Sequence, residues 1–225
     1  MKVTWIGQAG FLFEDKNRKI IIDPYLSDSC YKSNPRCFRR YPADEKYLEI
    51  QPDVIILTHD HLDHTDPETL DFYLKDKKGV TVLASANAWQ KVRAYGPDHN
   101  YVMFNNGTEF TACGITFKAV YAEHSDERAI GVVFSDGEKT YYITGDTLYN
   151  KKIFESINEK IDVLFLPING VGNNMNIFDA CRFADKIGAK KTVPCHFGLF
   201  DEIKPEMEID REDFIIPTPF KEIKL

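Results

Sequence analysis

The stretch Thr58-His59-Asp60-His61-Leu62-Asp63-His64 places three histidines and two aspartates within six consecutive positions. It follows residues 53–58, whose β-branched and apolar side chains predict a buried strand. A helix is expected to begin just beyond it, at Pro67. Imidazole and carboxylate groups are the usual protein ligands of Zn²⁺, Mn²⁺ and Fe²⁺. The stretch therefore predicts a metal site at the exit of a strand.

One ion cannot use all of these side chains. In a tight turn, His59 and His61 can point to one side while Asp63 and His64 reach the other, which predicts two adjacent metal sites. The alternative is a solvated polar loop in which Asp63 or His64 only caps the following helix. A cap needs one polar residue and this segment offers five, so the sequence favours metal binding.

Three further strand-like runs end in a histidine or an aspartate. Residues 115–122 precede His124, residues 140–144 precede Asp146, and residues 190–195 precede His196. Each residue alone is unremarkable. Together with the 59–64 cluster, however, four separate strands deliver such a residue at their exits, and loops at one sheet edge can converge on a site. We therefore expect all three to be ligands. His99, in a turn context, is expected on the surface.

The remaining pattern is one of short strands separated by helices. Strands are predicted at 2–7, 10–15, 19–24, 53–58, 80–85, 101–105, 109–112, 115–122, 129–135, 140–144, 161–168 and 190–195. Helices are predicted at 67–77, 86–95, 150–159 and 176–187, with a fainter pattern at 205–213. Short turns between early strands imply antiparallel pairs, and the later alternation implies crossovers. The mixture predicts sheets covered by helices.

Size and composition restrict the class of protein. The 225 residues contain no evident linker, so we expect one domain spanning 1–225. A net charge of −7 argues against nucleic-acid binding. No signal-peptide pattern is present and no apolar run approaches the ~20 residues of a membrane span. We expect a soluble, cytoplasmic protein with its five cysteines reduced, no membrane partner and a small-molecule substrate; a homo-oligomer is compatible with these data.

With these residues the chain resembles the metallo-β-lactamase superfamily, whose pattern His-x-His-x-Asp-His matches His59, His61, Asp63 and His64. The further ligands of the family match His124, Asp146 and His196 in order. The stretches around residues 7–11, 23–28 and 58–64 resemble the branch that contains the L-ascorbate-6-phosphate lactonases. The resemblance implies an α/β (α+β) fold, namely a four-layer αββα sandwich of two mixed β-sheets flanked by helices.

The resemblance also implies how two divalent ions, Zn²⁺ or Mn²⁺, are held. His59, His61 and His124 would bind one ion, and Asp63, His64 and His196 the other, with Asp146 bridging. Three neutral imidazoles leave an ion its full charge, and bound water can then lose a proton near pH 7. Asp63 would be the catalytic residue, because it can orient this hydroxide and pass a proton to the leaving group.

Other residues are candidates for substrate contacts. Arg36, Arg39 and Arg40 lie among aromatic residues, and guanidinium groups suit phosphate or carboxylate; a solvated or interface loop is the commoner outcome. Amide side chains follow another strand and could line the pocket, or belong to a strand-to-helix turn with Asn174 or Asn176 as N-cap: Asn169, Asn173 and Asn174. Asp23 is either an acceptor for a ligating histidine or a turn residue before Pro24.

The leading functional hypothesis is a metal-dependent hydrolase of a small, anionic ester or lactone, of the L-ascorbate-6-phosphate lactonase type. A phosphodiesterase for a small phosphodiester or nucleotide is the alternative within the enzymes, because the same hydroxide can attack phosphorus. A non-catalytic metal-binding protein is the alternative outside them. Diiron redox proteins of this fold favour a carboxylate where this chain has His61, and they carry a flavin domain for which 225 residues leave no room.

Overall fold

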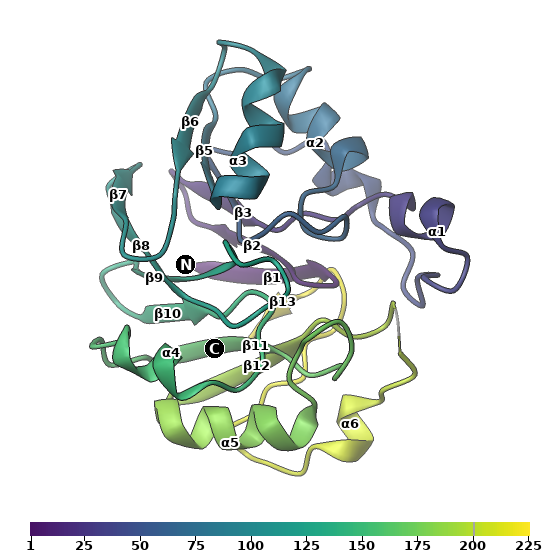
Figure 1. Ribbon diagram of the computed structural model, residues 1–225, viewed down its shortest axis with the longest axis vertical. Helices are drawn as coiled ribbons and strands as arrows, with labels where there is room; N and C mark the ends of the chain where they lie inside the picture. Colours follow the sequence, from purple (N-terminus) through teal and green to yellow (C-terminus); the bar gives the residue numbers. More distant parts are fainter. Residues whose placement is uncertain (200) are drawn as a thin grey trace.

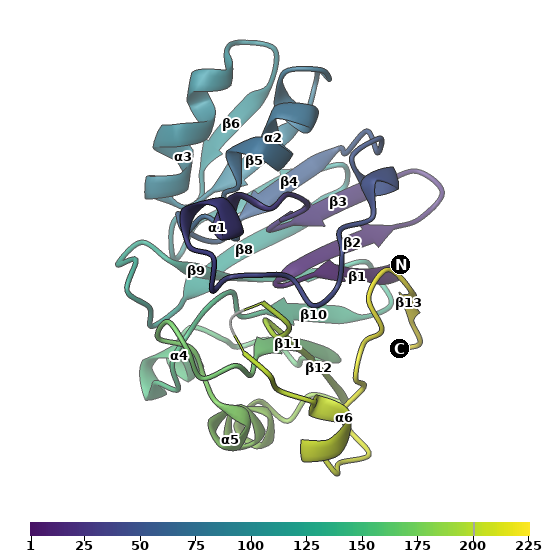
Figure 2. The same ribbon diagram turned by 90° about the vertical axis from the view of Figure 1, so that its right-hand side faces the viewer.

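Two β-sheets lie face to face, and helices cover their outer surfaces (Figure 1). The structure is a computed structural model that describes residues 1–199 and 201–225. Turning the molecule by 90° shows the same layers, with α2 and α3 beyond one sheet and α4 and α5 beyond the other (Figure 2). This arrangement confirms the predicted four-layer sandwich of two mixed sheets.

The first sheet has the strand order β13-β1-β2-β3-β4-β5-β6. Its strands β13, β1, β2 and β3 pair antiparallel, whereas β3, β4, β5 and β6 pair parallel. The bounds are β1 Lys2–Gly7, β2 Gly10–Glu14, β3 Lys19–Ile22, β4 Val54–Leu57, β5 Thr81–Ala84, β6 Asn100–Met103 and β13 Glu222–Ile223.

The second sheet has the order β12-β11-β10-β9-β8-β7. Strands β7 to β10 form an antiparallel meander, and β11 and β12 add parallel to β10. The bounds are β7 Glu109–Ala112, β8 Ile115–Tyr121, β9 Ile130–Ser135, β10 Thr140–Ile143, β11 Val163–Pro167 and β12 Lys191–Cys195. Strands β8, β10 and β12 therefore run in the same direction and end at the same edge.

The helices are short and lie mainly between strands. Their bounds are α1 Ser29–Ser33, α2 Pro67–Leu74, α3 Ala86–Val92, α4 Lys151–Glu155, α5 Ile177–Ile187 and α6 Pro205–Glu208, with 3₁₀ turns at Glu45–Tyr47 and Arg93–Tyr95. Helix α2 begins at an N-cap, Asp66, which accepts hydrogen bonds from the backbone of Glu68 and Thr69. Within the described ranges, no helix combines the length and the apolar character that a bilayer crossing requires.

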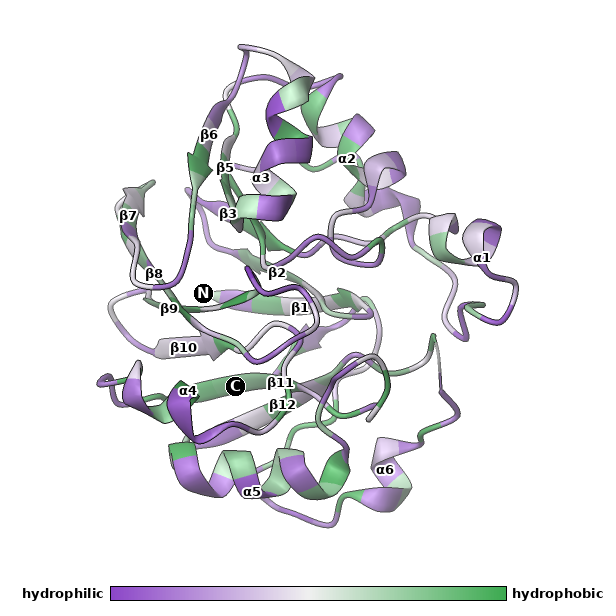
Figure 3. Cartoon of the chain, viewed as in Figure 1, coloured by the Kyte–Doolittle hydropathy of each residue, from purple (hydrophilic) through white to green (hydrophobic). Residues whose placement is uncertain are grey.

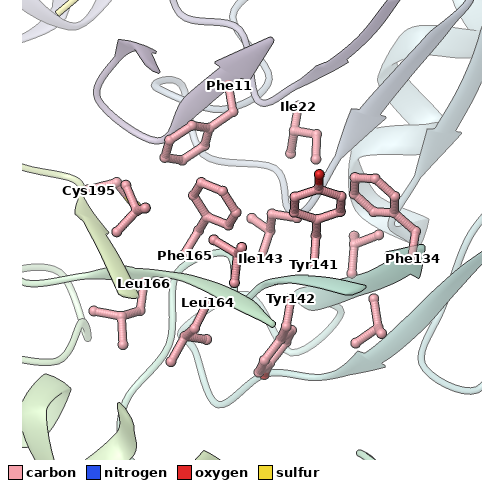
Figure 4. Packing of buried hydrophobic residues seen from close by; sticks show 14 of the residues in the cluster. Phe11, Ile22, Phe134, Tyr141, Tyr142, Ile143, Leu164, Phe165, Leu166 and Cys195 are labelled. Atoms are coloured by element: carbon pink, nitrogen blue, oxygen red, sulfur yellow. The ribbon is translucent and has the colours of Figure 1, made fainter. Parts of the chain in front are cut away.

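Aromatic side chains fill the space between the sheets. Phe11 of β2 packs edge-on against Phe165 of β11, with ring centroids 4.7 Å apart. Figure 4 shows the alternation along the second sheet, where Phe165 points toward the first sheet and Tyr142 points to the opposite side. Tyr142 there meets Phe183 of α5, at 6.3 Å between centroids. Figure 3 shows the corresponding pattern, with hydrophobic strands inside and hydrophilic segments along the outer helices.

All twelve predicted strands correspond to strands of the structure, with ends that differ by a few residues. The predicted helices at 150–159 and 205–213 are too long, since α4 and α6 are only five and four residues. Strand β13 was not predicted because two residues carry no periodicity, and it exists only by pairing with β1. His99 is half-buried rather than a surface residue: it bridges the Val80 amide and the Leu74 carbonyl.

Candidate metal centre

All seven predicted ligands meet at one edge of the sandwich. Their ligand atoms form two groups, in each of which the atoms lie within 4.8 Å of one another. The first group contains four side chains and the second three: His59, His61, His124 and Asp146; then Asp63, His64 and His196. The six other side chains are divided as the family resemblance implied, whereas Asp146, which the resemblance assigned as a bridge, is grouped with the first three histidines.

The strand directions explain why these side chains converge. The residues from His59 to His64 follow β4 in the loop that leads to α2. His124, Asp146 and His196 follow β8, β10 and β12, the three strands that end at the same edge of the second sheet. Two sheets packed face to face bring the β4 exit against that edge, so the fold assembles ligands that lie as far apart as 59 and 196.

Unpaired polar atoms show that the site fits cations. The buried Nε2 of His59 makes no hydrogen bond to any described residue, and the buried Nε2 of His64 and Oδ1 of Asp146 lie 3.3 Å from each other without the geometry of a hydrogen bond. Buried polar atoms without partners cost free energy. Here they point into a cluster of imidazoles and carboxylates, which is the donor set of Zn²⁺ and Mn²⁺. A divalent cation would satisfy them.

The two groups of the cluster differ in their electrostatics. Burial lowers the pKa of His59 well below its usual value, and burial also lowers the pKa of His124, so both rings are neutral donors. For His196, burial acts in the same direction, but the carboxylates of Asp146 and Asp63 outweigh it and raise its pKa to about 9. The second group therefore attracts protons where the first does not.

Most of these ligands are held by partners behind them. The Asp23 carboxylate accepts a hydrogen bond from Nδ1 of His64 at 2.8 Å, in the position that the sequence analysis proposed for it. Asp23 is also fixed by Thr58, whose backbone amide and hydroxyl donate to it at 2.8 and 2.6 Å. Asn174 donates to Asp146 at 2.8 Å. Such partners orient ligands and tune their basicity.

Gln8, which was not a candidate in the sequence, also belongs to this site. Its Nε2 donates to Oδ2 of Asp63 at 2.8 Å. A glutamine carries no charge and has no spacing rule for metal chemistry, so its role depends on tertiary packing alone. The available signal was its position in the turn Gly7–Gly10, which joins two strands that lead into the sandwich.

Three residues of the site have a left-handed backbone that only glycine adopts without cost. Their φ angles are +50° at Gln8, +44° at Asp23 and +56° at His196. Such conformations cost about 1–3 kcal/mol each and persist where the surrounding structure imposes them. They occur where a strand of each sheet ends or turns and must direct a side chain into the centre.

A small cavity opens beside the ligands. Its volume is about 120 Å³, and it is lined by four ligands and three residues of one loop: His61, Asp63, Asp146, His196, Val171, Gly172 and Asn174. Of the three amides proposed to contact substrate, only Asn174 lines it. Asn169 is buried and accepts a hydrogen bond from the Val171 amide, while Asn173 is exposed. Asn176 caps α5, as the alternative interpretation of this segment proposed.

The three arginines proposed to bind an anion do not line this cavity. Arg39 donates to the backbone oxygens of Ser27 and Tyr25, and its guanidinium stacks 3.9 Å from the centre of the Tyr25 ring. Arg40 donates to the Asp201 carboxylate at 3.1 Å and to a backbone oxygen. Arg36 is exposed. Arg39 thus stabilises the 25–45 segment internally, and Arg40 attaches this segment to residues 201–203.

The comparison with known families agrees with this geometry. A family described as "Beta-lactamase superfamily domain" matches residues 18–197, which include all seven ligand positions. The chain belongs to this superfamily. A UPF0173 metal-dependent hydrolase of Staphylococcus aureus is 32% identical, over 95% of this chain and 91% of the relative. This relative groups the chain with the metal-dependent hydrolases of the superfamily.

Solved structures share the fold at lower identity. A metallo hydrolase of the archaeon Ignicoccus hospitalis has a TM-score of 0.76 and 22% identity, covering 98% of this chain and 96% of that one. The isothiocyanate hydrolase from Delia radicum gut bacteria has a TM-score of 0.77 and 21% identity, covering 100% and 99%. The two solved structures confirm the sandwich architecture.

Proposed function

We propose that this protein is a dinuclear metal hydrolase that cleaves a small ester or lactone. The observation that carries the proposal is the convergence of seven ligands around buried, unpaired Nε2 and Oδ1 atoms. Membership of the superfamily and the likeness to a metal-dependent hydrolase support it. The L-ascorbate-6-phosphate lactonase branch suggests the ester or lactone class.

The two groups would hold one cation each, Zn²⁺ or Mn²⁺, with Asp146 between them. Cations bound there supply Lewis acidity and make hydroxide available near neutral pH. The neutral imidazoles of His59 and His124 suit this role because they do not cancel the charge of the ion. The ionised carboxylates of Asp63 and Asp146 compensate part of the total charge.

The chain itself contributes proton transfer and shape. Asp63 lines the cavity, and contacts with His64 and His196 hold its pKa below the usual range although burial raises it. Asp63 is therefore ionised, and it would orient a water molecule by accepting a hydrogen bond from it and then carry a proton to the leaving group. Val171, 46% exposed, and Gly172 line the same cavity and would cover a bound substrate in part.

The cavity favours a small substrate, and its lining does not require that the substrate be negatively charged. No Lys or Arg is among the described residues that line it, so an anionic group would find positive charge mainly in the two cations. Arg39 and Arg40, the sequence candidates for anion binding, are engaged with the protein itself. We therefore include neutral as well as anionic compounds among the candidate substrates.

The decisive experiment combines metal analysis with a substrate panel. Purified protein is expected to contain close to two equivalents of Zn²⁺ or Mn²⁺ and to hydrolyse lactones or esters, with phosphodiesters and thioesters as competing classes. Isothiocyanates belong in the panel because one structural neighbour acts on them. His59→Ala should abolish both metal and turnover, whereas His99→Ala, a histidine outside the centre, should retain them.

Two outcomes would replace the proposal. Faster turnover of phosphodiesters than of every ester and lactone would make the protein a phosphodiesterase. Two bound cations without turnover of any compound in the panel would favour a non-catalytic metal-binding protein. Full turnover after chelation would remove the metal mechanism altogether.

A further inference from the structure

The side-chain amide of Gln8 lies inside the metal centre. Its Nε2 is 2.8 Å from Oδ2 of Asp63, and the same nitrogen is 3.3 and 3.2 Å from Nδ1 and Nε2 of His196. The residue is only 4% exposed. One uncharged amide thus contacts two of the three side chains that form the second metal-binding group.

The backbone of Gln8 is fixed on both sides. Its carbonyl accepts a hydrogen bond from the indole Nε1 of Trp5 at 2.8 Å and another from the backbone amide of His196 at 2.9 Å. Trp5 is fully buried and packs against Phe197, with ring centroids 4.6 Å apart. The core therefore fixes the backbone from which the side-chain amide extends. The Gln8 carbonyl also joins the β1–β2 turn to the end of β12.

The Asp63 oxygen that Gln8 contacts is the one that faces the other ligands. Oδ2 is also 3.2 Å from Nε2 of His196 and 3.7 Å from Nε2 of His64. An amide donor occupies one lone pair of this oxygen and leaves another for a cation. A lysine or arginine donor would orient the oxygen equally well, but its charge would repel the ion. Glutamine orients the ligand without that cost.

We propose that Gln8 is a positioning residue that directs Oδ2 of Asp63 toward the cation held by Asp63, His64 and His196. The inference rests on the proposed two-cation site and assigns Gln8 to one half of it. Gln8 acts through Asp63 and does not bind the ion itself. Loss of the Gln8 amide should lower the affinity for the cation held by Asp63, His64 and His196. The affinity for the other cation, which would be held by His59, His61 and His124, should hardly change.

The test is a metal titration of Gln8→Met, which keeps the length and the unbranched shape of the side chain but cannot donate. Metal-free protein is titrated with Zn²⁺ or Mn²⁺ by calorimetry, and bound metal is counted by elemental analysis. We expect one of two cations to bind about 10–100-fold more weakly, the usual effect of losing an outer partner of a ligand. The other cation should change less than about twofold.

Gln90→Met is the matched control, because Gln90 is an exposed glutamine of α3. It should bind both cations like the parent protein. Gln8→Asn is the second variant, for the case that Gln8→Met does not fold. Asparagine tolerates the left-handed backbone at this position but withdraws the amide by one methylene, so the same selective loss is expected. The melting temperature of each metal-free variant verifies its fold.

A double-mutant cycle separates the positioning role from direct metal binding. In an Asp63→Ala background, Gln8→Met should change the affinity for the second cation less than about twofold, because its target is gone. A tenfold loss in that background would mean that Gln8 acts through His196 or binds the ion directly, and either result overturns the assignment to Asp63.

The remaining outcomes distinguish this inference from the proposed function. If the parent protein binds two cations and Gln8→Met binds both with unchanged affinity, the Gln8 assignment is wrong and the dinuclear proposal stands. If the parent protein binds no second cation, the dinuclear proposal and the Gln8 assignment both fail. None of these measurements depends on turnover.

Discussion

The carboxylate of Asp23 and the ring of His64 form a hydrogen bond of 2.8 Å on the side of the ring away from the other ligands. Nε2 of His64 lies 3.3 Å from Oδ1 of Asp146 on the opposite side. In the neutral ring, Asp23 thus keeps the proton on Nδ1 and leaves Nε2 available for a cation. Both side chains are almost completely buried, so solvent cannot replace the contact.

Asp23→Asn tests this relationship. The amide of asparagine would bring an N–H group against the Thr58 donors or against Nδ1–H of His64. We expect the affinity for the second cation to fall about 10–100-fold, measured by competition with a chelator of known affinity. Asp98→Asn, at an exposed aspartate, is the control and should bind like the parent protein. Equal affinities in the two variants would contradict the orienting role.

Metal binding should depend steeply on pH. The carboxylates of Asp146 and Asp63 raise the pKa of His196 to about 9 against the effect of burial, and the pKa of His64 is likewise raised well above 6.5. At pH 7 both rings of the metal-free protein are protonated, and a cation must displace these protons. Affinity for the second cation should therefore fall about tenfold per pH unit for each displaced proton as the pH is lowered from 8 to 6.

Calorimetry in two buffers with different ionisation enthalpies measures this effect directly. The binding heat should differ between the buffers in proportion to the protons released, close to two for the second cation. The first cation should release fewer, because burial keeps His59 and His124 neutral. Identical heats in both buffers would show that the second group is already deprotonated at pH 7.

The convergence of the seven candidate ligands was predictable because it follows from residue type and position. Histidine and aspartate at the exits of four strands are informative even without coordinates, since β8, β10 and β12 must end together once the sheet is formed. The sheets were predictable for a similar reason, because period-two and continuous apolar runs are long enough to recognise. The pattern that predicts the strands therefore also predicts His124, Asp146 and His196 as candidate ligands at the ends of these strands.

The surroundings of the ligands were not predictable in the same way. Gln8 acquires its role from contact with Asp63, which lies 55 positions away, and no local pattern reports such a contact. Arg39 and Arg40 are residue types that commonly bind anions. In the folded chain, however, their guanidinium groups already donate to backbone oxygens and to the Asp201 carboxylate. Whether an arginine side chain is available to an anionic substrate depends on the acceptors that lie next to it in the fold.

Gly145 should be essential for packing the two sheets together at the metal centre. Its φ is +61°, and a Cβ there would lie 2.7 Å from the carbonyl oxygen of Ile130 and 3.0 Å from Cβ of Thr58. We expect Gly145→Ala to lower the free energy of unfolding by about 2–4 kcal/mol, from strain and overlap together, as measured by urea denaturation. Thr58 supports Asp23 and His59, so metal affinity should fall as well.

Gly137→Ala is the control for this prediction, because Gly137 has φ +95° but nothing lies within 4 Å of its added Cβ. This substitution measures the cost of the backbone conformation without the overlap. We expect the free energy of unfolding to fall by about 1–2 kcal/mol, with no change in metal affinity. Equal destabilisation by the two substitutions would show that the backbone around Gly145 can shift to admit a methyl group.

Asp136 should contribute to stability at neutral pH and lose this contribution in acid. The amino group of Met1 lies 2.6 Å from Oδ2 of Asp136, the Tyr141 hydroxyl donates to the same oxygen at 2.8 Å, and both charged groups are buried. Burial raises the pKa of Asp136, but these donors and two backbone amides outweigh it and lower the pKa below 3.8. A lowered pKa in the folded state means that the stabilisation is complete above the unfolded value and disappears as the pH falls through the folded value.

Asp136→Asn should therefore lower the free energy of unfolding at pH 7 by about 1.5–3 kcal/mol, the usual contribution of hydrogen bonds to a charged group. The difference from the parent protein should shrink as the pH is lowered below about 4, where Asp136 of the unfolded chain becomes protonated. Urea denaturation at several pH values measures this on protein without an amino-terminal extension. Asp98→Asn, in an exposed pair with Lys78, should show little loss at any pH. A difference between Asp136→Asn and the parent that stayed constant from pH 7 to pH 3 would mean that the carboxylate charge is not what stabilises this contact.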